Sequence, residues 1–133
     1  MFFEENKTTN EIAALIRGAD GFFMFSNYEN LPVVIIEALA SGLPVLVSTN
    51  VNLATEIESA EAGWVAKLEP AAIEEALKIA LSSADERGRR GRNGLCLARR
   101  FDWSLIGEHL AQLYCQVANK SQNRNAVASG RRS

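Results

Sequence analysis

The chain has 133 residues, of which 47% are hydrophobic and 23% are charged, and its formal net charge is −2 at pH 7. This length suits one domain, and the near-neutral charge argues against the basic surface with which a domain binds nucleic acid. No apolar run is long enough to span a bilayer, and residues 1–5 lack the basic region and apolar core of a signal peptide. These features predict a cytoplasmic globular domain.

An amphipathic helix leads into the first strand. Thr8 or Thr9 can cap this helix at its start, and Gly18 can end it. The apolar run at residues 22–25 is too short for a buried helix and is rich in aromatic residues, which favours a buried strand. A polar loop follows at residues 26–30.

A second helix and a second strand come next. Pro32 suits the first position of a helix because its φ is fixed and its missing N–H is not needed there. The helix at residues 32–41 is apolar at nearly every position, and Gly42 suits the left-handed residue that ends it. The apolar run at residues 44–48 is again of strand length. This order of elements is typical of the βαβ unit of a parallel sheet.

Two glutamates mark one edge of this unit. Glu29 lies in the loop at the carboxyl end of the first strand, where open α/β sheets bind ligands. Glu37 lies in an apolar helix that is expected to be largely buried, where a carboxylate needs a partner or a wet cleft. The helix start offers N–H groups and a positive dipole end to a phosphate. The alternative for Glu29 is a solvated loop charge, and for Glu37 a half-exposed or paired charge at the helix rim.

The next segment continues the α/β pattern. A polar loop at residues 49–52, in which Asn52 is expected to adopt the left-handed conformation, leads to a helical turn at residues 53–59. A third strand is predicted at residues 62–66 and a helix at residues 69–82.

Residues 85–100 are rich in arginine. A solvated helix face is the favoured interpretation, and an anionic membrane surface or nucleic acid is the alternative partner. The glycines at positions 88, 91 and 94 weaken any long helix in this segment.

A final helix is predicted at residues 103–117, with Asp102 as its cap. Residues 119–133 are polar and lack periodicity, so the predicted organisation is a folded part at residues 1–118 and a disordered tail at residues 119–133. Cys96 and Cys115 are expected to be buried free thiols in a reducing compartment.

The residues around the two glutamates resemble the nucleotide-sugar-dependent glycosyltransferases of the GT-B fold, and most closely the retaining family 4, or glycosyl transferases group 1. Glu29 and Glu37, with seven residues between them, match the paired-glutamate motif of that family. Other matching segments are distributed along the chain: residues 19–20, 26, 37–45, 55–57, 62–65, 101–103 and 113–114. The likeness covers roughly residues 8–116.

The resemblance implies half of a Rossmann-like C-terminal domain, with about three parallel strands flanked by helices. Family members also have an acceptor-binding domain and donor-gripping basic residues that have no counterpart here. We therefore expect a fragment or a truncated gene model, inactive by itself. In this family the strand at residues 22–25 would be central in the sheet.

The resemblance further implies the donor-binding portion of a retaining transferase, which moves a sugar from a nucleoside diphosphate sugar to a hydroxyl acceptor on a glycan, lipid or small molecule. Glu29 would be the catalytic residue that binds the hydroxyls of the donor sugar, and Glu37 would bind the ribose hydroxyls. The diphosphate would be bound by N–H groups of the helix start: Asn30, Leu31 and Val33.

The role of Glu56 stays open. It matches a glutamate common in the family and is either a third carboxylate of the pocket or a helix-surface charge. No Asp-x-Asp pair is present, so neither a bound metal nor a cofactor is expected. The alternative functions are a non-catalytic remnant or interaction module that binds nucleotide weakly or not at all, and an unrelated nucleotide-binding α/β enzyme such as an epimerase. Peripheral membrane contact also stays open.

Overall fold

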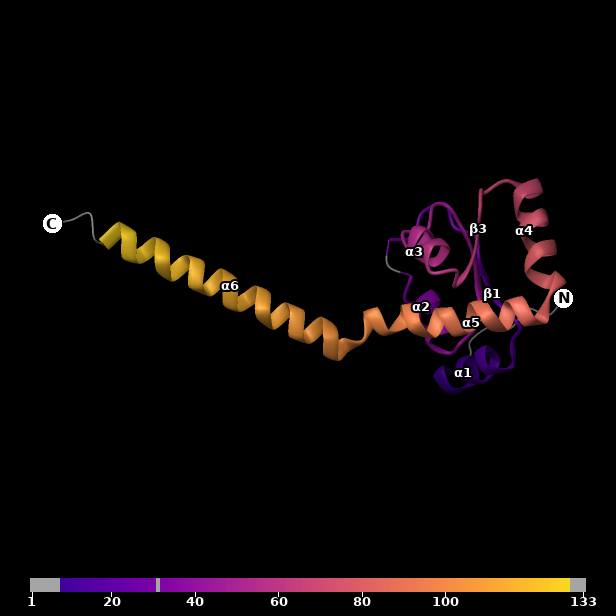
Figure 1. Cartoon of the computed structure of the whole chain (residues 1–133), viewed down its shortest axis with the longest axis horizontal. Coiled ribbons are helices and arrows are strands. Elements are labelled where there is room, and N and C mark those ends of the chain that lie inside the picture. Colours follow the sequence, from indigo (N-terminus) through magenta and orange to yellow (C-terminus); the bar gives the residue numbers. More distant parts are fainter. Residues whose placement is uncertain (1–7, 31, 130–133) are drawn as a thin grey trace. The chain divides into compact units, whose positions relative to one another are not determined.

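The computed structural model describes residues 8–30 and 32–129. The elements follow one another along the chain as drawn in Figure 1: α1 (Thr9–Gly18), β1 (Phe22–Met24), α2 (Val33–Ala40), β2 (Val45–Ser48), α3 (Ala54–Ser59), β3 (Gly63–Ala66), α4 (Pro70–Ser82), α5 (Ala84–Ala98), a 3-10 turn (Arg99–Phe101) and α6 (Trp103–Ser129). They form two compact units, and the chain passes from the first to the second between Arg100 and Phe101.

The first unit is built on a parallel sheet with the strand order β1-β2-β3. Val45, Leu46 and Val47 of the central strand β2 are fully buried. Helix α4 packs on one face of the sheet, where Leu46 and Ala76 share a core cluster, and α2 and α3 lie on the other side (Figure 1). This arrangement confirms the predicted α/β fold with three parallel strands flanked by helices.

Strand β1 is less buried than the sequence predicts. Phe22 and Met24 are half-buried, and Phe23 is 39% exposed. The reason is its position in the sheet: within the described residues, β1 is paired on one side only, with β2. An edge strand has a neighbouring strand along only one of its edges, so its side chains are covered less completely than those of a central strand.

Helix α1 begins as the sequence predicts. Thr8 is its N-cap, and its side chain and that of Glu11 form a reciprocal capping box. Bonds of this kind satisfy N–H groups that have no partner within the helix.

Helix α5 is continuous in spite of its glycines, which corrects the expectation that they weaken a long helix here. Gly91 and Gly94 are buried against α2 and the turn that follows it. A Cβ atom added at Gly91 would lie 2.1 Å from the carbonyl oxygen of Gly42, and one added at Gly94 would lie 2.9 Å from Leu39 Cδ2. The glycines therefore allow the close approach of two helix backbones, and packing compensates for their poor helix propensity.

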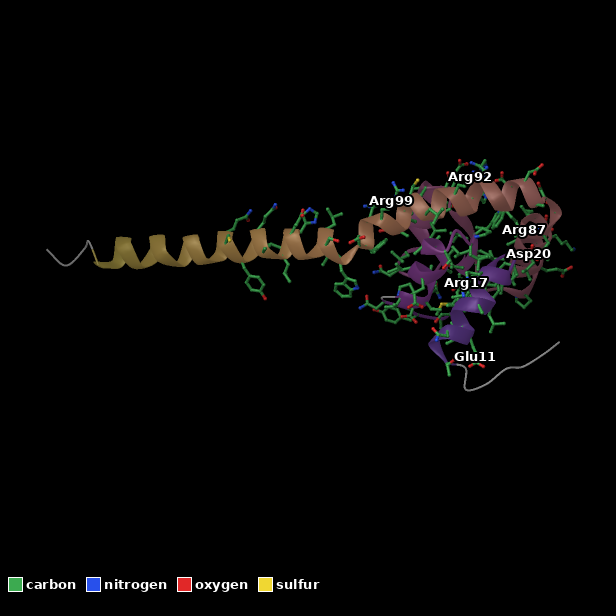
Figure 2. All side chains as sticks on the ribbon, turned by 90° about the horizontal axis from the view of Figure 1, so that it is seen from below. Glu11, Arg17, Asp20, Arg87, Arg92 and Arg99 are labelled. Atoms are coloured by element: carbon green, nitrogen blue, oxygen red, sulfur yellow. The ribbon has the colours of Figure 1, made fainter. Side chains whose placement is uncertain are left out.

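The arginines of α5 and of the 3-10 turn after it differ in exposure and in their partners. Arg92 and Arg99 are exposed on the outer side of this segment, as predicted for a solvated face (Figure 2). Arg89 and Arg90 instead bind Glu86, with N–O distances of 2.7–2.8 Å, and their hydrogen bonds lower the pKa of that carboxyl to about 2. Arg89 also pairs with Glu61 at 2.7 Å. Part of the arginine run thus joins α5 to the segment before β3.

Helix α6 is longer than predicted. The carboxylate of Asp102 accepts a hydrogen bond from the Ser104 N–H at 2.8 Å, which confirms the predicted cap. The helix then continues to Ser129, where the sequence predicts a disordered tail from residue 119. Residues 118–129 contain neither proline nor glycine, so nothing in this stretch breaks the helix. Among the described residues, no helix has the length and apolar character needed to cross a membrane.

Both cysteines are exposed free thiols, which corrects the expectation that they are buried. In α5 the inward positions are those of Gly94 and Leu97, and Cys96 lies between them on the outer side. Helical periodicity therefore directs Cys96 to solvent.

Candidate functional site

Two loops lie side by side at the carboxyl edge of the sheet. Glu29, in the loop between β1 and α2, forms an isolated parallel bridge with Val51 in the loop between β2 and α3. The Glu29 N–H donates to the Asn50 carbonyl at 3.4 Å, and the Asn52 N–H donates to the Glu29 carbonyl at 2.9 Å. The structure thus places Glu29 where the sequence predicts, half-buried and with its main chain fixed by the neighbouring loop.

The start of α2 differs by one residue from the prediction. Pro32 is the N-cap, not the first helical residue, and the helix begins at Val33. The Pro32 carbonyl accepts from the N–H groups of Ile35 and Ile36, at 3.0 and 3.2 Å. The amides of Val33 and Val34 precede these first helical donors, and no side chain of the described residues caps the helix. Leu31, the third expected phosphate-binding residue, lies outside the described residues.

Glu37 lies on the exposed face of α2, which corrects the expectation of a largely buried helix. Ile35, Ala38 and Leu39 form the buried face. Glu37 is four residues after Val33, which is 54% exposed, so the two side chains share one face of the helix. Glu37 therefore has access to water without a buried partner. Among the described residues, no ion pair joins Glu29 or Glu37 to a basic side chain.

Glu56 and Asn52 lie near the same edge. Glu56 is half-buried in the first turn of α3, directly after the loop that borders Glu29. Asn52 does not adopt the left-handed conformation that the sequence predicts for it. Among the described non-glycine residues, the positive φ belongs to Glu61, at 49°. The side chain of Asn52 has a different role: it donates to the Asn30 carbonyl at 3.1 Å.

The start of α2 follows the loop that contains Glu29, has no side-chain cap among the described residues, and has a carboxylate on either side of it in the sequence. Glu29 precedes Val33 by four residues, and Glu37 follows it by four. Helix N-terminal amides and the positive end of the dipole bind anions, and ionised carboxylates accept strong hydrogen bonds from hydroxyl groups. The chemistry of this edge therefore fits a ligand that carries both a phosphate and hydroxyl groups.

The sequence matches the family described as "Glycosyl transferases group 1" over residues 1–95. The chain belongs to this family. The match confirms the group 1 resemblance on which the expected site residues rest.

Two glycosyltransferases of known name resemble nearly the whole chain. It is 30% identical over 121 residues to a D-inositol 3-phosphate glycosyltransferase of Corynebacterium glutamicum (strain R), covering 90% of this chain and 29% of that protein. It is also 30% identical over 119 residues to a phosphatidyl-myo-inositol mannosyltransferase of Mycobacterium leprae (strain TN), covering 88% and 32% of the two chains. The chain thus spans less than a third of the length of these relatives.

Solved structures of glycosyltransferases share the fold. The sucrose-phosphate synthase from Thermosynechococcus elongatus matches with a TM-score of 0.76 and 26% identity, over 90% of this chain and 30% of that one. WaaG, a glycosyltransferase involved in lipopolysaccharide biosynthesis, matches with a TM-score of 0.64 and 28% identity, over 78% of this chain and 29% of that one. These likenesses confirm the predicted GT-B type of α/β fold in this group 1 chain.

Proposed function

We propose that the chain is the donor-binding portion of a retaining glycosyltransferase, which transfers a sugar from a nucleoside diphosphate sugar to a hydroxyl acceptor. One observation carries this proposal. In a chain of the group 1 family, Glu29 lies in a loop at the carboxyl edge of the sheet, four residues before the uncapped start of α2, and Glu37 lies on the exposed face of that helix, four residues after its start.

The diphosphate is bound at the start of α2. Asn30 and Val33 supply N–H groups, together with Leu31, and Pro32 supplies none. Departure of the diphosphate is the difficult event of the reaction because negative charge grows on the leaving group. Fixed N–H donors and the positive end of the α2 dipole stabilise that charge without having to reorganise.

The two carboxylates bind the sugar rings on either side of the diphosphate. Glu29 accepts hydrogen bonds from hydroxyls of the donor sugar and acts as the catalytic residue, and Glu37 accepts them from the ribose. Support comes from the accessibility of both side chains and from the absence of ion pairs to either one within the described residues. A carboxylate already neutralised by an arginine would bind hydroxyls less strongly.

The acceptor is a hydroxyl group on a glycan, lipid or small molecule. The names of the two relatives, which include D-inositol 3-phosphate and phosphatidyl-myo-inositol, favour a hydroxyl-rich acceptor. A cytoplasmic location is part of the proposal, and the exposed free thiols of Cys96 and Cys115 fit a reducing compartment.

Titration of the 133-residue chain with UDP-glucose, GDP-mannose and ADP-glucose tests the donor role directly. We expect saturable binding of at least one of them by isothermal calorimetry, and weaker binding of the corresponding nucleoside monophosphate. In Glu29→Gln the affinity for the sugar nucleotide should fall about fivefold, because a hydrogen bond to a neutral amide is weaker than one to a carboxylate by about 1 kcal/mol. The affinity for the nucleoside diphosphate without its sugar should be unchanged.

Glu69→Gln is the matched control. Glu69 is an exposed glutamate that also precedes the start of a helix, but that helix is α4, which packs on one face of the sheet. The proposal fails if none of the three sugar nucleotides binds. The sugar contact alone fails if Glu29→Gln and the control bind the sugar nucleotide equally well.

A further inference from the structure

We propose that Ser48 and Asn52 are positioning residues that hold the Glu29 loop, defined as residues 25–30, in the shape that the donor requires. This inference rests on the proposed function, since it concerns how Glu29 and Asn30 are presented to the sugar nucleotide. Both positioning residues come from β2 and the loop that follows it, and neither is in the set of expected site residues.

Ser48 fixes the beginning of the Glu29 loop. It is the last residue of β2 and is fully buried. Its hydroxyl donates to the Ser26 carbonyl at 2.7 Å and accepts from the Ser26 N–H at 3.0 Å. A buried hydroxyl must be hydrogen-bonded to offset the loss of water, and here both bonds go to one backbone unit of the loop.

The hydrogen bonds continue from Ser26 toward Glu29. The Ser26 hydroxyl donates to the Tyr28 carbonyl at 3.0 Å and accepts from the Tyr28 N–H at 3.3 Å. Tyr28 directly precedes Glu29, so Ser48 restrains the main chain up to the residue before the carboxylate. The Tyr28 ring itself is 76% exposed and contributes little packing to the loop.

Asn52 fixes the other end of the Glu29 loop. Its main-chain N–H donates to the Glu29 carbonyl at 2.9 Å, and its side-chain amide donates to the Asn30 carbonyl at 3.1 Å. Asn30 lies two residues before Pro32, the N-cap of α2. The Asn52 side chain therefore ties the carboxylate loop to the place where the diphosphate-binding helix begins.

The other restraints on the loop within the described residues are few. Phe25 packs half-buried against the core cluster of the sheet, Glu29 pairs with Val51 in an isolated bridge, and none of the side chains of residues 25–30 is fully buried. A binding group that is already held in place loses less conformational entropy when the ligand binds. Loss of either anchor should therefore loosen the loop and weaken donor binding, while the core of the sheet is preserved.

Amide hydrogen exchange and nucleotide titration of Ser48→Ala and Asn52→Ala test this inference on the full chain. Asn50→Ala is the matched control, because Asn50 is in the same loop but its side chain bonds only to Thr49 among the described residues. We expect the main-chain amide of Ser26 in Ser48→Ala, and those of Glu29 and of position 52 in Asn52→Ala, to exchange about fivefold faster, the equivalent of one hydrogen bond. The affinity of Asn52→Ala for the best-binding sugar nucleotide should be about fivefold lower than that of the unsubstituted chain. The nucleotides compared are UDP-glucose, GDP-mannose and ADP-glucose.

Asn52 is exposed, so Asn52→Ala should unfold at the same urea concentration as the control. This variant therefore tests the inference even if Ser48→Ala is unstable. Unchanged exchange in the Glu29 loop, or unchanged nucleotide affinity with a loosened loop, overturns the positioning role. If the unsubstituted chain binds no sugar nucleotide, the proposed function fails, and the exchange rates still decide whether Ser48 and Asn52 hold the loop.

Discussion

Glu37→Ala is expected to weaken binding of the sugar nucleotide by about 1.5–3 kcal/mol, or roughly 10- to 150-fold, which is the range for hydrogen bonds to a charged group. Glu37 is exposed on α2, and alanine favours the helix, so the fold should be unaffected. The loss should be equal for the nucleoside diphosphate with and without its sugar, because Glu37 is assigned to the ribose. Isothermal calorimetry on the full chain measures both affinities.

Glu75→Ala provides the control for this change, since Glu75 is also an exposed glutamate in the middle of a helix. It should bind the nucleotide as the unsubstituted chain does. A Glu37→Ala protein with unchanged affinity would refute the ribose role. If the affinity falls only for the nucleoside diphosphate that carries the sugar, Glu37 contacts the donor sugar and not the ribose.

Gly91→Ala is expected to lower the free energy of unfolding by about 2–4 kcal/mol, near the upper end of overpacking effects. The new methyl group would meet the Gly42 carbonyl oxygen at 2.1 Å, a backbone atom that cannot rotate away. Gly42 is itself fixed at a φ of +76°, so α5 must move away from α2. Urea denaturation followed by circular dichroism measures this loss.

Gly88→Ala in the same helix separates steric contact from helix propensity. A Cβ atom there would have only the end of the Arg92 side chain within 4 Å, at 3.6 Å. This substitution should therefore stabilise the chain by about 0.5–1 kcal/mol, the advantage of alanine over glycine within a helix. If both variants are stabilised alike, the close contact between α2 and α5 is not present in solution.

The sheet could be predicted from the sequence because its signals are local. The apolar runs around Phe22 and Val45 have strand length, and Gly42 adopts the left-handed conformation that ends α2, at a φ of +76°. The position of Glu29 follows from the same pattern, since the loop after a parallel strand lies at its carboxyl edge.

The features that the sequence did not predict depend on which face of each helix or loop is covered by other parts of the fold. Helix α2 is apolar at almost every position, yet Val33 and Glu37 are exposed because α5 and β2 cover only the opposite face. The glycines of α5 have low helix propensity, and only the approach of Gly42 explains Gly91. Asn52 was expected to serve as a turn residue, whereas its amide bonds to a loop that is 22 residues away in the sequence.

The most direct test of the central claim is a residue-resolved map of diphosphate binding by NMR of the ¹⁵N-labelled chain. The nucleoside diphosphate and monophosphate of the tightest-binding base are titrated separately, and the shifts that only the diphosphate causes are compared. Binding at the start of α2 predicts that these shifts are largest at the amides of Asn30, Val33 and Val34. Diphosphate-specific shifts at the start of α4 or α5, with none at α2, would contradict it.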